Sequence, residues 1–173
     1  MHPQITVAIP SLPARSQLLI RALRSVGRQT LPAAAVSVAL DVSRAGAAAT
    51  RQRALDAVQT PWVALLDDDD AFKAEHLEKL YAFAIDSGAD LAYAWFDMVG
   101  GIDPFPITHQ TQEFDPANPI ETTITVLVRA GLAKEVGYAP LDRGHNTNSG
   151  EDYGFVLGCV AAGSIIRNMN AGR

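Results

Sequence analysis

The sequence predicts an α/β fold in which a mostly parallel central sheet is flanked by helices. First, short apolar segments alternate with longer amphipathic ones through the first hundred residues. Second, the short segments are almost continuously hydrophobic, as strands buried on both faces are. Third, three of them run directly into polar side chains, at the sheet edge where open α/β sheets bind ligands. Together these observations indicate a single α/β unit with a binding site at one edge of its sheet.

The composition is that of one globular domain. The chain has 173 residues, of which 48% are hydrophobic and 19% charged, enough for one core. A formal net charge of -5 disfavours simple binding to a nucleic-acid backbone. The single cysteine, Cys159, and an N-terminus without a signal-peptide pattern predict a cytoplasmic protein. No apolar run approaches the roughly 18 residues that a membrane span needs.

The first half is predicted to consist of four strands and three helices in alternation. Runs of Val, Ile and Leu bounded by Pro, Gly or polar residues indicate strands. Apolar side chains three or four positions apart indicate helices. In chain order the elements cover residues 5–9, 17–29, 36–40, 47–58, 62–66, 73–87 and 91–99. Each strand–helix–strand connection should be right-handed.

The second half is less regular. Residues 100–121 contain four prolines and are predicted to form a long functional loop. A strand, two helices separated by a polar loop, and the start of a last strand are then predicted, at residues 123–128, 129–136, 151–162 and 164–166.

Polar side chains follow three of the predicted strands. Pro10 and Ser11 follow the first strand, Asp41 follows the second, and four aspartates at 67–70 follow the third. If these strands are parallel neighbours, their carboxyl ends share one cleft. Four adjacent carboxylates repel one another unless a cation lies between them, and Mg²⁺ or Mn²⁺ prefers such oxygen ligands. The alternative is a solvated acidic turn.

Three further side chains have two interpretations each. Arg51, on the helix before the acidic strand, belongs either to a solvated helix face or to a cation site near the aspartates or a phosphate. Glu151 and Asp152 stand at a helix N-terminus, where carboxylates are stabilised by backbone N–H groups. A carboxylate there is also well placed to act as a general base facing the cleft. Spacing alone does not separate these interpretations.

Seven segments have a common family likeness when they are taken in order. They are ITVAIP at 5–10, LRSVGRQT at 23–30, VALDVS at 38–43, ATRQRA at 49–54, LLDDDD at 65–70, VLVRAGLAKEVGY at 126–138, and ED at 151–152 followed by AG at 162–163. In this order they resemble the family-2 glycosyltransferases, which have the GT-A nucleotide-sugar fold.

The resemblance implies one GT-A (Rossmann-like) domain over residues 1–173. Residues 1–99 would be the nucleotide-sugar-binding half and residues 100–173 the acceptor-side half. It implies a metal-dependent, inverting transfer of a sugar from a nucleoside-diphosphate sugar, expected to be a UDP-sugar, to an acceptor hydroxyl. The cofactor would be Mn²⁺ or Mg²⁺. The acceptor and the oligomeric state are not indicated.

The resemblance also implies roles for single residues. Asp67 and Asp69 match the metal-binding aspartates, and Asp152 matches the catalytic base. Asp70 is expected to cap the following helix instead. The substrate-binding positions that the resemblance implies are Pro10, Ser11, Asp41, Arg51, Asp67, Asp68 and Glu151.

Two alternatives to this function are a nucleotide-sugar-binding module without catalysis and a nucleotidyltransferase on a related fold. The loop from Ser11 to Arg15 lacks the glycine-rich phosphate loop that the second alternative needs. Many family members place a further metal ligand, often His, after the ED helix, but no His follows Asp152 in this sequence. His109 and His145 are the nearby candidates, and their loop setting favours ordinary surface histidines.

Overall fold

The structure is a computed structural model that describes residues 4–102, 112–117, 125–139 and 150–170. Its strands are β1 (Ile5–Ser11), β2 (Ala35–Leu40), β3 (Trp62–Leu65), β4 (Leu91–Tyr93), β5 (Val126–Arg129) and β6 (Ile166–Asn168). Its helices are the 3₁₀ helix η1 (Pro13–Arg15), α1 (Ser16–Val26), α2 (Ala47–Asp56), α3 (His76–Asp86), α5 (Ala130–Val136) and α6 (Glu151–Ala161).

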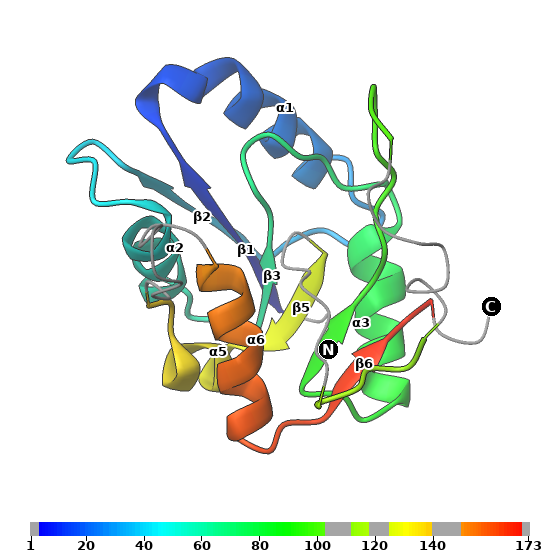
Figure 1. The fold of residues 1–173 in the computed structure, drawn as a ribbon. Coiled ribbons are helices and arrows are strands. Elements are labelled where there is room, and N and C mark those ends of the chain that lie inside the picture. The colour runs from blue at the N-terminus through cyan, green and yellow to red at the C-terminus, as the bar shows by residue number, and fades with distance from the viewer. Residues whose placement is uncertain (1–3, 103–111, 118–124, 140–149, 171–173) are drawn as a thin grey trace.

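One mixed sheet runs through the molecule in the order β2-β1-β3-β5-β4-β6 (Figure 1). β1 pairs in parallel with β2 and β3, and β4 pairs in parallel with β6. β5 is antiparallel to both of its neighbours, β3 and β4. The predicted α/β class is therefore confirmed, and the first three strands are parallel neighbours as expected.

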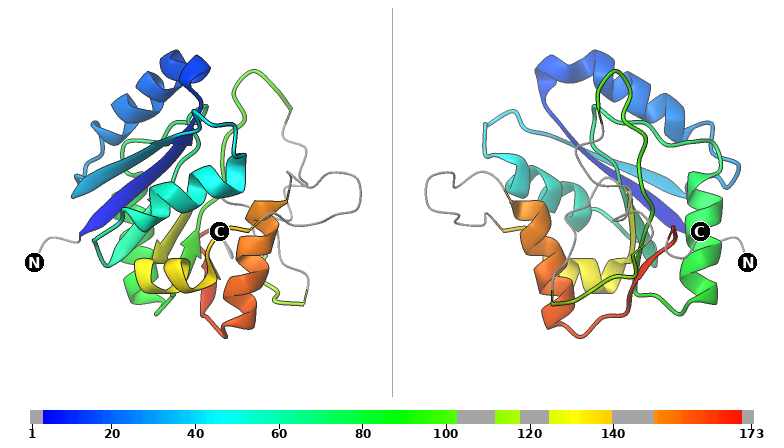
Figure 2. Two further views of the ribbon diagram at one scale, coloured as in Figure 1. Left: turned by 90° about the vertical axis from the view of Figure 1, so that its left-hand side faces the viewer. Right: turned by 45° about the vertical axis from the view of Figure 1, so that its right-hand side comes forward.

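Helices cover both faces of this sheet (Figure 2). α1 and α3 pack on one face and bury Ile5, Val7 and Ile9 of β1. α2, α5 and α6 pack on the other face around Phe155 and Cys159, so Cys159 is a core residue. Within the described ranges, no helix is long and apolar enough to cross a membrane.

The first strand continues through a proline that was expected to end it. β1 extends to Ser11, whose carbonyl accepts a bond from the Asp41 N–H on the β2 side. On the other side, β3 leaves the ladder at Leu66, which donates to the Ala8 carbonyl. Pro10 therefore lies where its missing N–H would face no paired strand, which is where a sheet tolerates proline.

The third helix begins at His76, three residues later than its predicted start at residue 73. The side chain of Gln29 explains the difference. Its amide nitrogen donates to the Lys73 carbonyl at 2.8 Å, and its amide oxygen accepts from the Leu77 N–H at 2.9 Å. The glutamine thus occupies both groups that would close the first helical turn.

The fourth strand is shorter than predicted. β4 ends at Tyr93, which is also where its pairing with β5 and β6 ends. Beyond it, the Trp95 N–H donates to the side chain of Asn170, and the rings of Trp95 and Phe96 stack 5.2 Å apart. Trp95 and Phe96 therefore pack against each other and do not extend the strand, and Met98 and Val99 beyond them are exposed.

Candidate functional site

A cleft opens at the carboxyl ends of β1, β2 and β3. Its volume is about 330 Å³, and its lining combines backbone, arginines and aspartates. The lining residues are Pro10, Ser11, Leu12, Arg15, Asp41, Gly46, Ala47, Thr50, Arg51, Asp67, Asp68 and Asp69. The polar strand ends that the sequence predicted to converge therefore do so.

Asp41 closes one side of the cleft from the end of β2. The residue is only 6% exposed, and its carboxylate accepts the backbone N–H groups of Ala45 (2.8 Å) and Gly46 (2.9 Å). These two bonds hold the pKa of Asp41 below its ordinary value. The carboxylate is thus ionised and fixed, and it also shapes the loop between β2 and α2.

Asp68 is the anchor of the acidic turn. It is 3% exposed and accepts a hydrogen bond from the Ser11 hydroxyl at 2.6 Å. Arg15 of η1 donates to its other oxygen at 3.0 Å and also reaches Asp69 at 3.3 Å. Arg21 of α1 donates to the Asp69 carbonyl. Two arginines from the segment after β1 therefore tie down the acidic turn.

The other three aspartates form a cluster. Oxygen atoms of Asp67, Asp69 and Asp70 lie within 4.8 Å of one another. Burial and the charges of the first two raise the pKa of Asp70 to about 6. The predicted cap role of Asp70 is wrong, because α3 starts six residues further on and Glu75 occupies its N-cap position. Asp70 belongs instead with the expected pair, Asp67 and Asp69.

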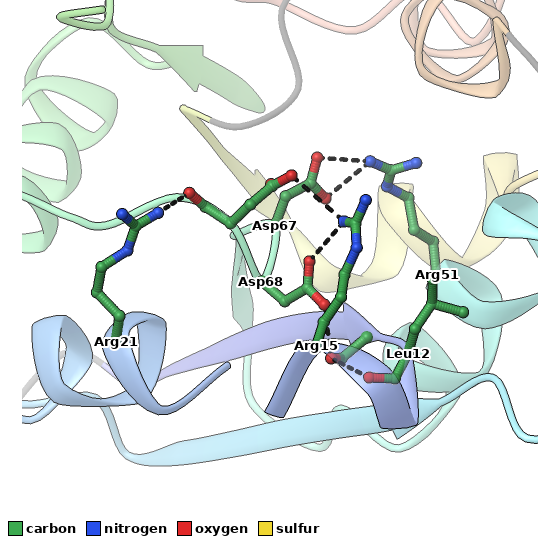
Figure 3. A network of polar contacts seen from close by, with 8 residues as sticks. Leu12, Arg15, Arg21, Arg51, Asp67 and Asp68 are labelled. Atoms are coloured by element: carbon green, nitrogen blue, oxygen red, sulfur yellow. Dashed lines mark hydrogen bonds and ion pairs between the residues drawn. The ribbon is translucent and has the colours of Figure 1, made fainter. Parts of the chain in front are cut away.

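Arg51 joins the acidic turn to the last helix. Its Nη2 binds both carboxylate oxygens of Asp67, at 2.7 and 2.8 Å (Figure 3). Its Nη1 binds the carboxylate of Glu151 and forms an ion pair with Asp152 at 3.2 Å. The Arg51 side chain is only 12% exposed, so it is not part of a solvated helix face. One guanidinium therefore faces three carboxylates from two separate segments.

Glu151 and Asp152 begin α6, after the N-cap residue Gly150. The Glu151 carboxylate is buried and points to Arg51. The Asp152 side chain is one-third exposed, so it combines the ion pair with access to solvent. The interpretation of these acids as simple helix caps therefore misses their shared contact with Arg51.

Every residue of the predicted site either lines the cleft or forms an ion pair with Arg51. His109 and His145 lie outside the described residues. Sequence reasoning missed the roles of Arg15 and Arg21, because their partners lie about fifty positions away in the chain. The four consecutive aspartates at 67–70 could have indicated these roles, because such a run needs basic side chains from elsewhere in the chain.

Comparison with known proteins gives a family match. A family model described as "Glycosyl transferase family 2" matches residues 35–133, which is more than half of the chain. The matched range includes Asp41, Arg51 and the acidic turn. No curated protein sequence matches the chain significantly.

Solved structures share the fold. The crystal structure of S. aureus TarS 1–349 superposes with a TM-score of 0.78 at 16% identity, covering 96% of this chain and 58% of that one. Its complex with UDP-GlcNAc gives a TM-score of 0.76 at 16% identity, with 96% and 56% covered. Mannosyltransferase PcManGT from Pyrobaculum calidifontis, in complex with GDP-Man and Mn²⁺, gives 0.64 at 13% identity, with 97% and 57% covered. The chain thus spans less than two thirds of each of these structures.

Proposed function

Because the chain belongs to glycosyl transferase family 2, we propose that it transfers a sugar from a nucleoside-diphosphate sugar to an acceptor hydroxyl. The observation that supports this best is the Arg51 cluster. It brings Asp152, from late in the chain, to the edge of the sheet where the acidic turn lines the cleft. A UDP-sugar is the proposed donor, because TarS has been crystallised with UDP and with UDP-GlcNAc.

The cleft suits a nucleotide sugar. In this proposal Asp41 accepts a hydrogen bond from the nucleobase, since each carboxylate oxygen keeps a lone pair beyond its backbone bond. Pro10, Ser11 and Asp68 form the wall beside it. Arg51 would bind the diphosphate, for which its planar fork is suited.

The acidic turn fits a divalent cation. Asp67 and Asp69, joined by Asp70, offer hard oxygen ligands within 4.8 Å of one another, as Mg²⁺ and Mn²⁺ require. Burial, then the charges of Asp69 and Asp67, raises the pKa of Asp70 to about 6, and a cation bound there would favour its ionised form. A cation held there would neutralise charge on the leaving diphosphate. PcManGT, a fold neighbour, has been determined with Mn²⁺.

Asp152 is the proposed general base. Its ion pair with Arg51 favours the ionised carboxylate, and its partial exposure leaves access for an acceptor. As the acceptor oxygen forms its bond to the anomeric carbon, Asp152 takes the hydroxyl proton. The bond to the diphosphate breaks on the opposite face, and its electron pair leaves with the diphosphate. A single displacement of this kind inverts the anomeric centre. Glu151 would support Asp152 by holding Arg51 in place.

The experiment compares wild type, Asp152→Asn and Asp86→Asn. Asp86 lies at the exposed end of α3 and serves as the matched control. UDP with Mg²⁺ or Mn²⁺ should raise the Tm of all three proteins. Release of UDP from a panel of UDP-sugars should fall by about 10²–10⁴ in Asp152→Asn only.

Binding of UDP without transfer in the wild type would instead identify a binding module without catalysis. The absence of both a thermal shift and sugar transfer, with every nucleoside diphosphate and nucleotide sugar tested, would contradict the proposal. The cytoplasmic location predicted from the sequence is part of the same proposal.

A further inference from the structure

Tyr138 is held beside the Arg51 cluster by two other elements. It follows Gly137, which ends α5, and is 7% exposed. Its ring stacks on Phe155 of α6, with centroids 4.7 Å apart and planes 13° from parallel. Its backbone N–H donates to the side-chain oxygen of Gln52 on α2 at 2.7 Å. Tyr138 is therefore fixed between the helix that carries Arg51 and the helix that carries Asp152.

The Tyr138 hydroxyl is buried and has no hydrogen-bond partner among the described residues. Buried hydroxyls nearly always have one, and a missing partner is destabilising. A phenylalanine would make the same ring stack without this penalty. Packing alone therefore explains the ring but leaves the hydroxyl unexplained.

The charged groups near the Tyr138 hydroxyl indicate which side chain it could bind. Burial raises the pKa of Tyr138 well above its ordinary value, Arg51 opposes that shift, and Asp152 and Asp67 add to it. The hydroxyl thus stays protonated, and the ring that carries it stacks on Phe155, one helical turn from the proposed base on α6. A neutral O–H group can donate to a carboxylate without competing for the proton that the carboxylate must take.

In the structure Arg51 forms an ion pair with Asp152. In the proposed reaction the donor diphosphate competes with Asp152 for the same guanidinium. We propose that Tyr138 is a positioning residue, whose hydroxyl donates a hydrogen bond to the Asp152 carboxylate when Arg51 turns to the diphosphate. The inference rests on the function proposed above. It explains the presence of a hydroxyl for which no described residue of the unliganded protein provides a hydrogen-bond partner.

The test is Tyr138→Phe, with Tyr93→Phe as the matched control. Tyr93 is also buried, at 3% exposed, and its hydroxyl likewise lacks a hydrogen-bond partner within the described ranges. Burial alone raises the pKa of Tyr93 to about 12, so no charged group accounts for its shift. Both variants remove one buried hydroxyl, but only Tyr138 is fixed between α2 and α6, the helices that carry Arg51 and Asp152.

For Tyr138→Phe we expect kcat for transfer from a UDP-sugar to fall about tenfold, the effect of one hydrogen bond to a charged group. The KM for the donor should stay within about twofold of wild type, because the hydroxyl acts on the base and not on the donor. The Tm should be unchanged or higher, because an unsatisfied hydroxyl has been removed. Tyr93→Phe should keep the wild-type kcat.

Three results for Tyr138→Phe would overturn the inference: an unchanged kcat, a raised KM with unchanged kcat, or a Tm lower by several degrees. If the wild type transfers sugar and Tyr138→Phe has the same kcat, only the role of Tyr138 is contradicted. A wild type that neither transfers nor is stabilised by UDP with Mg²⁺ contradicts the proposed function, and with it the role of Tyr138.

Discussion

At the scale of single residues, Arg51 decides the charge balance of the site. One guanidinium compensates Asp67, Glu151 and Asp152, and its own side chain is 12% exposed. Half-buried carboxylates without a partner are strongly destabilising, whereas an intact buried pair contributes little by itself. The cluster therefore makes Arg51 much harder to replace than an ordinary helix-surface arginine.

Replacement of Arg51 by Met should lower the free energy of unfolding by about 2–4 kcal/mol at pH 7. Arg53→Met, two positions along the same helix and 41% exposed, should cost less than about 1 kcal/mol. Urea unfolding measures both. Equal losses in the two variants would argue against the cluster.

His76 should make stability depend on pH. Its ring stacks on Phe72 at 4.3 Å, and burial, then Lys73, lowers its pKa from 6.5 to about 4. Below pH 6.5 His76 binds a proton in the unfolded chain but not in the folded protein. The free energy of unfolding therefore falls as the pH drops from 6.5 toward 4. The loss should reach about 2–3 kcal/mol. His76→Phe keeps the stack and should flatten this part of the curve in urea unfolding from pH 7.5 to 4.5; parallel curves would contradict the assignment.

The sequence predicts those parts of the site whose position depends only on the order and direction of the strands. Parallel neighbouring strands bring their carboxyl ends together, so the cleft followed from the apolar runs before Ser11, Asp41 and Asp67. Pairing between individual side chains could not be predicted, because Arg15 and Asp68 meet only through the tertiary fold. The same holds for the buried hydroxyl of Tyr138, because the residue resembles an ordinary core aromatic in the sequence.

At the scale of elements, the contact between α5 and α6 sets the position of Asp152. Gly158 of α6 faces Val136 of α5 so closely that an added Cβ would lie 2.4 Å from a Val136 methyl carbon. A side chain at this position requires Val136 to move or the two helices to separate. Separation of the helices would also displace α6, whose N-terminus carries the proposed base.

Gly158→Ala should therefore lower the free energy of unfolding by about 1–3 kcal/mol, as overpacking does. Val136→Ala in the same chain should recover much of the loss, because it removes the clashing methyl groups. Gly131→Ala on α5 is the matched control: an added Cβ there meets nothing within 4 Å, so the change should be neutral or stabilising. Chemical denaturation of the wild type, the three single variants and the double variant measures these changes. Additive losses from Gly158→Ala and Val136→Ala would show that the two residues do not clash.

Element type was predictable along most of the chain, but several boundaries were not. Periodicity identifies a helix in residues 73–87, yet its start is set by Gln29, which binds the Lys73 carbonyl and the Leu77 N–H from another element. The end of β4 is likewise set by where its partners stop. Boundaries of this kind depend on neighbours that are distant in sequence.

At the scale of the whole molecule, β5 joins the two halves of the chain. It comes from the second half and lies between β3 and β4 of the first half. Without it, the sheet would divide into two parts. The halves suggested by the sequence, residues 1–99 and 100–173, are therefore interleaved in one sheet, whatever their separate roles in binding.

A single cooperative unfolding transition is the expected consequence. Leu127, at the centre of β5, is fully buried, and Leu127→Ala should lower the free energy of unfolding by about 2–5 kcal/mol. The fluorescence of Trp62 and Trp95 reports on β3 and on the segment after β4, circular dichroism reports on the whole chain, and both midpoints should move together. A variant in which one signal shifts and the other stays would indicate two independently folding parts.

The two hydrogen bonds from Arg51 to the carboxylate of Asp67 affect the order in which a cation and a diphosphate can bind. A cation arriving alone must displace the guanidinium and leave it without that partner. A diphosphate arriving with the cation offers the guanidinium a new anion. Affinities for the two ligands should therefore be coupled, each tightening the other by the same factor. The protein would resist loading with bare metal and accept the metal–nucleotide complex as a unit.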